Sequence, residues 1–233
     1  MQKPPSKTIT AERTRNLSLR LFIFKMIFAL VSLFLIFGIV FYFYGTLQRK
    51  EEPVNVSKVE SDILKYGYYI NDNASNYYKD EFAKLKTILE SDERDDNLYI
   101  TQLAKVFVID LLSLNNKINK YEVTSSQYFN STKREMYTNK VVGDFYDYIE
   151  DNSYNDRKQS LPEVSDVIMN ELKTTTYKMG EESVPAYEIT AEVSYVSDLG
   201  YDKLVDVILT KEDNKYSVVS YKSGESKDKK VEE

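Results

Sequence analysis

Cysteine and histidine are both absent from this sequence of 233 residues. The lack of cysteine excludes disulfide bonds and metal sites made of thiolates. The lack of histidine removes the commonest zinc ligand and the side chain that most often serves as a general base. We therefore expect neither a metal ion nor a cofactor in this protein.

Charged residues are almost absent from one stretch of the sequence, Leu21 to Tyr44. It carries a single charged residue, Lys25, and the 19 residues from Met26 onward carry none. As an α-helix those residues would extend about 28 Å, close to the thickness of the hydrocarbon core of a bilayer. We predict a transmembrane helix over residues 21–44. The expected anchors at its two membrane interfaces are Lys25 and, at the opposite end, Phe41, Tyr42, Phe43 and Tyr44.

The distribution of basic residues predicts the orientation of this helix. Six basic residues and one acid, Glu12, precede the charge-free run, whereas only three basic residues follow it closely. Because basic residues are retained on the cytoplasmic side, we expect residues 1–20 to be a flexible cytoplasmic arm. A cleaved signal peptide would have a shorter apolar region that ends in small residues. The prediction is a single-pass plasma-membrane protein with its C-terminal domain outside.

The rest of the chain is acidic. The first 50 residues carry eight bases and one acid, so the remainder must carry a net charge of −13 to give the total of −6. Such a charge repels phosphates, and we expect no nucleic-acid partner. We predict a spacer at 45–62, a folded domain at 63–222 and a disordered charged tail at 223–233. A surface domain without disulfides, rich in Asn, Lys, Ile and Tyr, indicates a low-GC Gram-positive bacterium.

Apolar spacing of three and four residues predicts three helices in the first half of the domain. They cover residues 75–90, 97–118 and 132–148, and no proline interrupts residues 54–161. Thr132 and Glu135 have the spacing of a capping box at the start of the third helix. The state of residues 60–72 stays open, because the apolar run there is short and contains Gly67.

Beyond Pro162 the apolar period changes from 3.6 to 2, which indicates strands. Alternation is clearest from Tyr187 to Tyr195, and further strands are expected at 167–179, 204–210 and 216–221. Short turns between them predict a four-stranded antiparallel meander. Helices followed by strands indicate an α+β domain in which about three helices pack on one face of a cone-like sheet.

This layout resembles a known family. An N-terminal arm, one span, a spacer, helices and then an antiparallel sheet are similar to the bitopic assembly factors of type IV secretion and conjugation machines. Their outer domains have the nuclear-transport-factor-two-like fold. The resemblance implies a scaffold that binds other machine components and self-associates, without catalytic residues. The stretch LAKVFVIDLLSLNNKINKYEV is also similar to uncharacterised single-pass membrane proteins of low-GC Gram-positive bacteria.

Two carboxylates are the candidates for catalysis. Asp110 and Asp144 each lie near the edge of the apolar face of a predicted helix, so both could be half-buried in one cleft. Two such carboxyl groups within about 5–10 Å could hydrolyse a glycoside. The alternative is that each pairs with a lysine, such as Lys117 or Lys140, caps a helix or meets solvent.

Acidic clusters at 92–97 and 151–156 could supply oxygen ligands, but neither has the glycine and glutamate of the twelve-residue calcium loop. We interpret both as solvated turns. The sequence thus leaves three functional hypotheses. The first is an extracytoplasmic scaffold that binds other membrane or envelope proteins, or a second copy of itself. The second is a cell-wall hydrolase, and the third is a ligand or glycan sensor that uses some of the 20 tyrosines.

Overall fold

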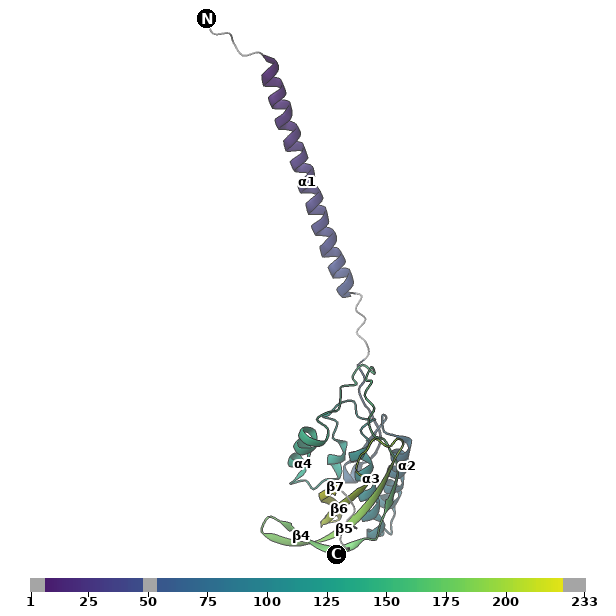
Figure 1. Ribbon diagram of the computed structural model, residues 1–233. Helices are drawn as coiled ribbons and strands as arrows, with labels where there is room; N and C mark the ends of the chain where they lie inside the picture. The colour runs from purple at the N-terminus through teal and green to yellow at the C-terminus, as the bar shows by residue number, and fades with distance from the viewer. Residues whose placement is uncertain (1–6, 48–53, 224–233) are drawn as a thin grey trace, which may run out of the picture. The chain divides into compact units, whose positions relative to one another are not determined.

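The computed structural model describes residues 7–47 and 54–223 (Figure 1). The chain divides into two compact units, residues 1–52 and 53–233, which we describe separately. We refer to residues 54–223 as the folded unit. Most of the predicted tail at 223–233, and residues 48–53 of the predicted spacer, lie outside the described residues.

The described part of the first unit is one helix, α1 (Lys7–Leu47). Its segment Arg20–Phe43 is 24 residues of high hydropathy, long and apolar enough to cross a membrane. None of its side chains is buried, unlike those of a core helix in a soluble protein. Lys25 and Phe41 are exposed, and the Tyr42 and Phe43 rings meet edge to face at 6.0 Å. The side chain of Tyr44 lies outside the described part. Residues 7–20 of the predicted flexible arm are helical, since α1 starts well before the apolar run.

The folded unit opens with a hairpin that the sequence left undecided. Strand β1 (Val59–Ile63) pairs antiparallel with β2 (Tyr68–Asn71) through the 3₁₀ turn Leu64–Tyr66. Gly67 closes the turn with φ = 67°, a conformation that glycine adopts without steric cost. Because β1 begins at Val59, the last residues of the predicted spacer belong to the folded unit instead.

Two helices follow, each with a side-chain cap. In α2 (Asn76–Glu90) the Ser75 hydroxyl accepts from the N–H of Tyr78, and in α3 (Asp96–Leu112) the Asp95 carboxylate accepts from two backbone N–H groups. The prediction that the second helix continues to residue 118 was wrong. Past Ser113 the N–H groups of Leu114 and Asn115 donate to the distant carbonyl of Pro162, so tertiary hydrogen bonds replace the helical ones.

The third predicted helix, 132–148, is shorter than expected. It comprises α4 (Arg134–Lys140) and a π-helical turn at Val141–Phe145, after the 3₁₀ helix η2 (Thr124–Tyr128). The predicted capping box does not form, because the Thr132 hydroxyl donates to Asn130 and Lys133 is the capping residue without a side-chain bond. The helix ends where the Tyr146 N–H reaches back to the carbonyl of Val141.

The second half is an antiparallel sheet of five strands, which confirms the α+β class but corrects the strand count. The strands are β3 (Val164–Met169), β4 (Lys173–Met179), β5 (Glu182–Tyr195), β6 (Leu204–Glu212) and β7 (Lys215–Ser223). Their order is β3-β5-β6-β7, and β4 also pairs with β5. The predicted single strand at 167–179 is two strands, since the 14-residue β5 pairs with β4 in its first half and β3 in its second. Figure 1 shows the β4 hairpin reaching beyond the rest of the sheet.

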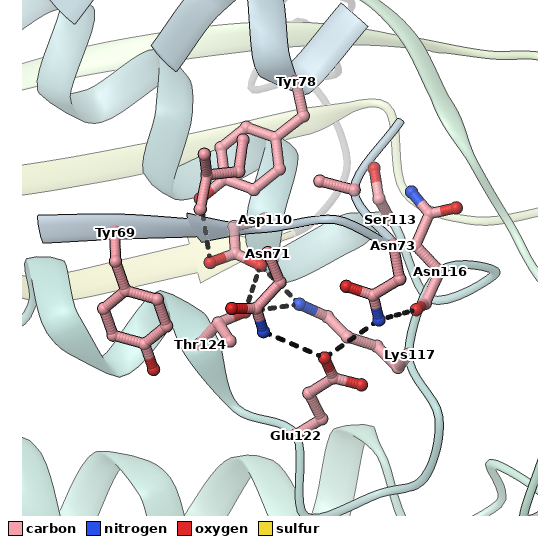
Figure 2. A pocket seen from close by; sticks show the side chains of 12 residues that line it. Tyr69, Asn71, Asn73, Tyr78, Asp110, Ser113, Asn116, Lys117, Glu122 and Thr124 are labelled. Carbon is pink, nitrogen blue, oxygen red and sulfur yellow. Dashed lines mark hydrogen bonds and ion pairs between the residues drawn. The ribbon is translucent and has the colours of Figure 1, made fainter. Parts of the chain in front are cut away.

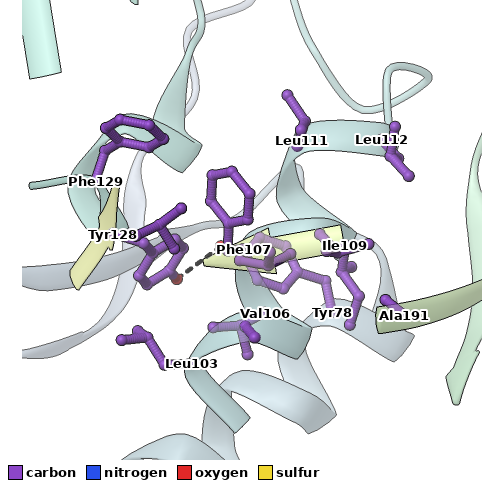
Figure 3. Packing of buried hydrophobic residues seen from close by; sticks show 14 of the residues in the cluster. Tyr78, Leu103, Val106, Phe107, Ile109, Leu111, Leu112, Tyr128, Phe129 and Ala191 are labelled. Carbon is purple, nitrogen blue, oxygen red and sulfur yellow. Dashed lines mark hydrogen bonds between the residues drawn. The ribbon is translucent and has the colours of Figure 1, made fainter. Parts of the chain in front are cut away.

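Helix α3 forms the centre of the hydrophobic core. It contacts α2 and η2 as well as strands β3, β5, β6 and β7, and most of its residues are buried. Figure 3 shows Phe107 of this helix beside Tyr128 and Tyr78. In the same core, the rings of Phe129 and Tyr137 stack with their centres 4.1 Å apart. Many tyrosines are therefore core residues with a polar end, which must find a hydrogen-bond partner.

Candidate functional site

Asp110 is the centre of a buried polar cluster between α3, α2 and η2 (Figure 2). Its side chain is 1% exposed and forms an ion pair with Lys117, whose side chain is 6% exposed. Lys117 follows α3, in the loop that the sequence placed within the helix. The lysine alternative considered for Asp110 is thus confirmed.

Two hydroxyl groups complete the hydrogen bonding of the Asp110 carboxylate. Thr124 donates to Oδ1 at 2.6 Å and Tyr78 donates to Oδ2 at 3.1 Å. The Lys117 ammonium also donates to the Thr124 hydroxyl at 2.7 Å. A buried carboxylate of this kind is tolerated only when it is paired and hydrogen-bonded, and Asp110 meets both conditions.

The phenols in this cluster stay protonated. Burial, and next the nearby Asp110 carboxylate, raise the pKa of Tyr78 well above its ordinary value, and the same two causes raise the pKa of Tyr128. The two hydroxyl groups are 2.8 Å apart, so they form a chain that ends on Asp110. Neutral phenols can donate hydrogen bonds to a carboxylate but do not serve as bases near neutral pH.

Beside the ion pair lies a cavity of about 20 Å³, room for about one water molecule. Its polar lining includes Glu122, which accepts from Asn73 at 3.0 Å and from Asn71 at 3.4 Å. The second Glu122 oxygen accepts from the N–H of Ile118 at 2.6 Å. The Nδ2 atom of Asn116, another lining residue, is buried without a partner among the described residues. A sugar or a peptide does not fit.

Asp144, the second candidate carboxylate, lies elsewhere. It is exposed on the π-helical turn and does not line the Asp110 cavity. The structure therefore does not place the two in one cavity with space for a substrate between them, the arrangement that glycoside hydrolysis requires. The cluster as found can stabilise the fold, and it offers little access to a substrate.

The acidic segment at 92–97 has structural partners. Asp95 caps α3, and Asp96 bonds Lys211 and Tyr216 at 2.9 Å each and Arg94 at 2.8 Å. The hydrogen bond from Lys211 is the main cause that lowers the pKa of Asp96 to about 2. At 151–156, Asp151 accepts from Ser153 within a turn. Within the described ranges, no group of three or more Asp or Glu side chains could hold a metal ion.

A partly exposed tyrosine patch was not found from the sequence. It consists of Tyr148, which is exposed, and of Tyr195 and Tyr201, which are half-buried, and we include the exposed Val196 and Leu199 of the same β5–β6 loop. The Tyr148 and Tyr201 hydroxyls are 2.6 Å apart, and the Tyr195 and Tyr201 rings are 6.2 Å apart. Val196 is 65% exposed and Leu199 43%. Alternation along β5 predicted which of its residues face inward. No pattern in the sequence predicted that Tyr201 of the following loop would contact Tyr148.

Comparison with known proteins adds no relative: no family model, no curated protein and no solved structure matches this chain.

Proposed function

We propose that this protein is a membrane-anchored scaffold, with a cytoplasmic N-terminus and a folded unit outside the plasma membrane of a Gram-positive bacterium. In this proposal the folded unit binds other envelope proteins, or a second copy of itself, in an envelope-spanning or conjugation-like assembly. The observation that carries it is one apolar helix in the same chain as a folded unit with a partly exposed tyrosine patch.

The composition of the patch supports a role in protein binding. Tyrosine is enriched at interface centres, where a few residues supply most of the binding energy. The Tyr195 hydroxyl donates to the carbonyl of Asp202 at 2.7 Å, which holds the β5–β6 loop in place before a partner arrives. A partner in the same membrane would meet the tethered unit at high effective concentration, so moderate contacts suffice.

Site-specific photo-crosslinking in living cells tests the proposal. A photoreactive residue at Leu199, in the tyrosine patch, should give crosslinked products that mass spectrometry identifies as envelope proteins or a second copy. The matched control is the same residue at Thr176, which is exposed on β4. Equal yields at the two positions, or no product at Leu199, would contradict the scaffold proposal.

A further inference from the structure

An open basic pocket lies at the turn between β6 and β7, away from the Asp110 cluster. Its volume is about 510 Å³, within the range of ligand sites. Lys65 and Tyr66 line it from the β1–β2 turn, Ser131 and Arg134 from the start of α4, and Lys215 from the start of β7. Phe129 adds a second aromatic ring to the lining.

The three basic side chains are not neutralised. None of Lys65, Arg134 and Lys215 forms an ion pair with another described residue, although nine ion pairs occur elsewhere in that part of the chain. Glu212 and Asp213 also line the pocket, and both are exposed on the turn. Three bases against two acids leave a net charge of +1 in an otherwise acidic domain.

Lys215 is held in place without an ion pair, although the charge of the Glu212 carboxylate acts on it. Its ammonium donates to the carbonyl of Tyr66 at 2.6 Å and lies 4.4 Å from the centre of the Tyr68 ring. Burial, and next the positive charge of Arg134, lower the pKa of Lys215. Arg134 and Lys215 repel each other, and an anion between them would stabilise both charges.

We propose that the basic pocket binds a phosphate group. The guanidinium of Arg134 makes one bond within the protein, to the carbonyl of Phe129 at 3.3 Å, so most of its donors are free for phosphate oxygens. Lys215 keeps two of its three donors, and Lys65 and the Ser131 hydroxyl are exposed beside them.

Two sources outside the membrane could supply this chemistry, a phosphodiester of a lipid headgroup or wall polymer and a free phosphate. Isothermal titration calorimetry on the full chain in uncharged detergent micelles distinguishes them. One titration uses glycerophosphoglycerol and the other inorganic phosphate, both at constant ionic strength. Stronger binding of the diester would identify the first source, and stronger binding of inorganic phosphate the second.

Variants decide whether the response comes from this pocket. Arg134→Gln and Lys65→Gln change exposed side chains, and each should weaken binding about tenfold or more with an unchanged circular dichroism spectrum. The matched control is Lys178→Gln, which removes an exposed lysine of β4 and should leave affinity unchanged. No heat from either ligand, or equal weakening by Lys178→Gln, would overturn the proposal.

Discussion

The buried ion pair of Asp110 and Lys117 is the residue-scale feature with the largest energetic consequence. Two charges removed from water lose several kcal/mol of solvation each, and their attraction offsets this only with good geometry and further hydrogen bonds. Thr124 and Tyr78 supply those bonds here. Removal of one charge should therefore be much more harmful than removal of both.

We predict that Asp110→Asn destabilises the folded unit by about 3–5 kcal/mol, because it leaves the Lys117 ammonium buried without a counter-charge. The double variant Asp110→Leu, Lys117→Met should recover much of this loss. Urea unfolding of the full chain in uncharged micelles, followed by near-ultraviolet circular dichroism, measures both.

Asp144→Asn is the matched control, since Asp144 is exposed and should change stability by less than about 0.5 kcal/mol. The two single variants also test the hydrolase hypothesis. If Asp144→Asn abolished a cell-wall phenotype while stability stayed unchanged, that result would support a catalytic role for the Asp144 carboxylate. A stable Asp110→Asn variant would contradict the energetic argument for the ion pair.

Asp96 makes the stability depend on pH at the acidic end. Its pKa is about 2 in the folded protein against an ordinary 3.8, mainly because Lys211 bonds the carboxylate. A lowered folded-state pKa adds stability above pH about 4, and this stability is lost as the pH falls toward about 2. The side chain is 38% exposed, so solvent screening keeps the contribution below about 1 kcal/mol.

We expect Asp96→Asn to flatten the dependence of unfolding free energy on pH between about 4 and 2. The comparison is Asp198→Asn, whose carboxylate pairs with Lys203 in an exposed loop and should change this slope less. A slope in Asp96→Asn as steep as in the parent protein would show that other carboxylates dominate acid unfolding.

At the scale of elements, the starts of α2 and α4 allow a direct comparison. Ser75 caps α2 with a 3.1 Å bond to the N–H of Tyr78, whereas the capping box expected from Thr132 and Glu135 does not form. Ser75→Ala should cost about 1 kcal/mol of stability, and Glu135→Ala less than about 0.5 kcal/mol. Thermal unfolding of both variants measures the difference, and a larger loss in Glu135→Ala would contradict the structure.

Local periodicity was enough to predict α2, most of α3 and the inward face of β5. It failed at Leu114 and Ile118, which continue the helical spacing and are buried, but in a loop that bonds to Pro162. It also failed to separate β3 from β4, because the break between them follows from pairing with a single long partner, β5. Both errors arise from contacts between residues far apart in sequence.

The same reason limits what the sequence tells about the site. The helical wheel identified Asp110 as flanking the apolar face, and Lys117 was among its possible partners. Tyr78 and Thr124 come from other elements, and no local pattern connects them to Asp110. Residues of the basic pocket likewise come from three separate segments, so charge in any one of them carried no signal.

At the scale of the whole molecule, a scaffold for envelope proteins requires the folded unit to lie outside the cell. The basic arm predicts a cytoplasmic N-terminus. The part beyond residue 50 has a net charge of −13, so it lacks the excess of basic residues that keeps a segment on the cytoplasmic side. A folded unit inside the cell could bind neither wall components nor outer partners. Orientation is therefore the property on which the scaffold proposal stands.

The absence of cysteine makes orientation measurable with single introduced thiols. We predict that a membrane-impermeant maleimide added to intact cells labels Ser183→Cys, at an exposed position in the β4–β5 hairpin, and does not label Ser6→Cys in the arm. After the cells are opened with detergent, both thiols should react, which controls for accessibility. Labelling of Ser6→Cys alone in intact cells would reverse the topology and place the folded unit in the cytoplasm, which would contradict the scaffold proposal.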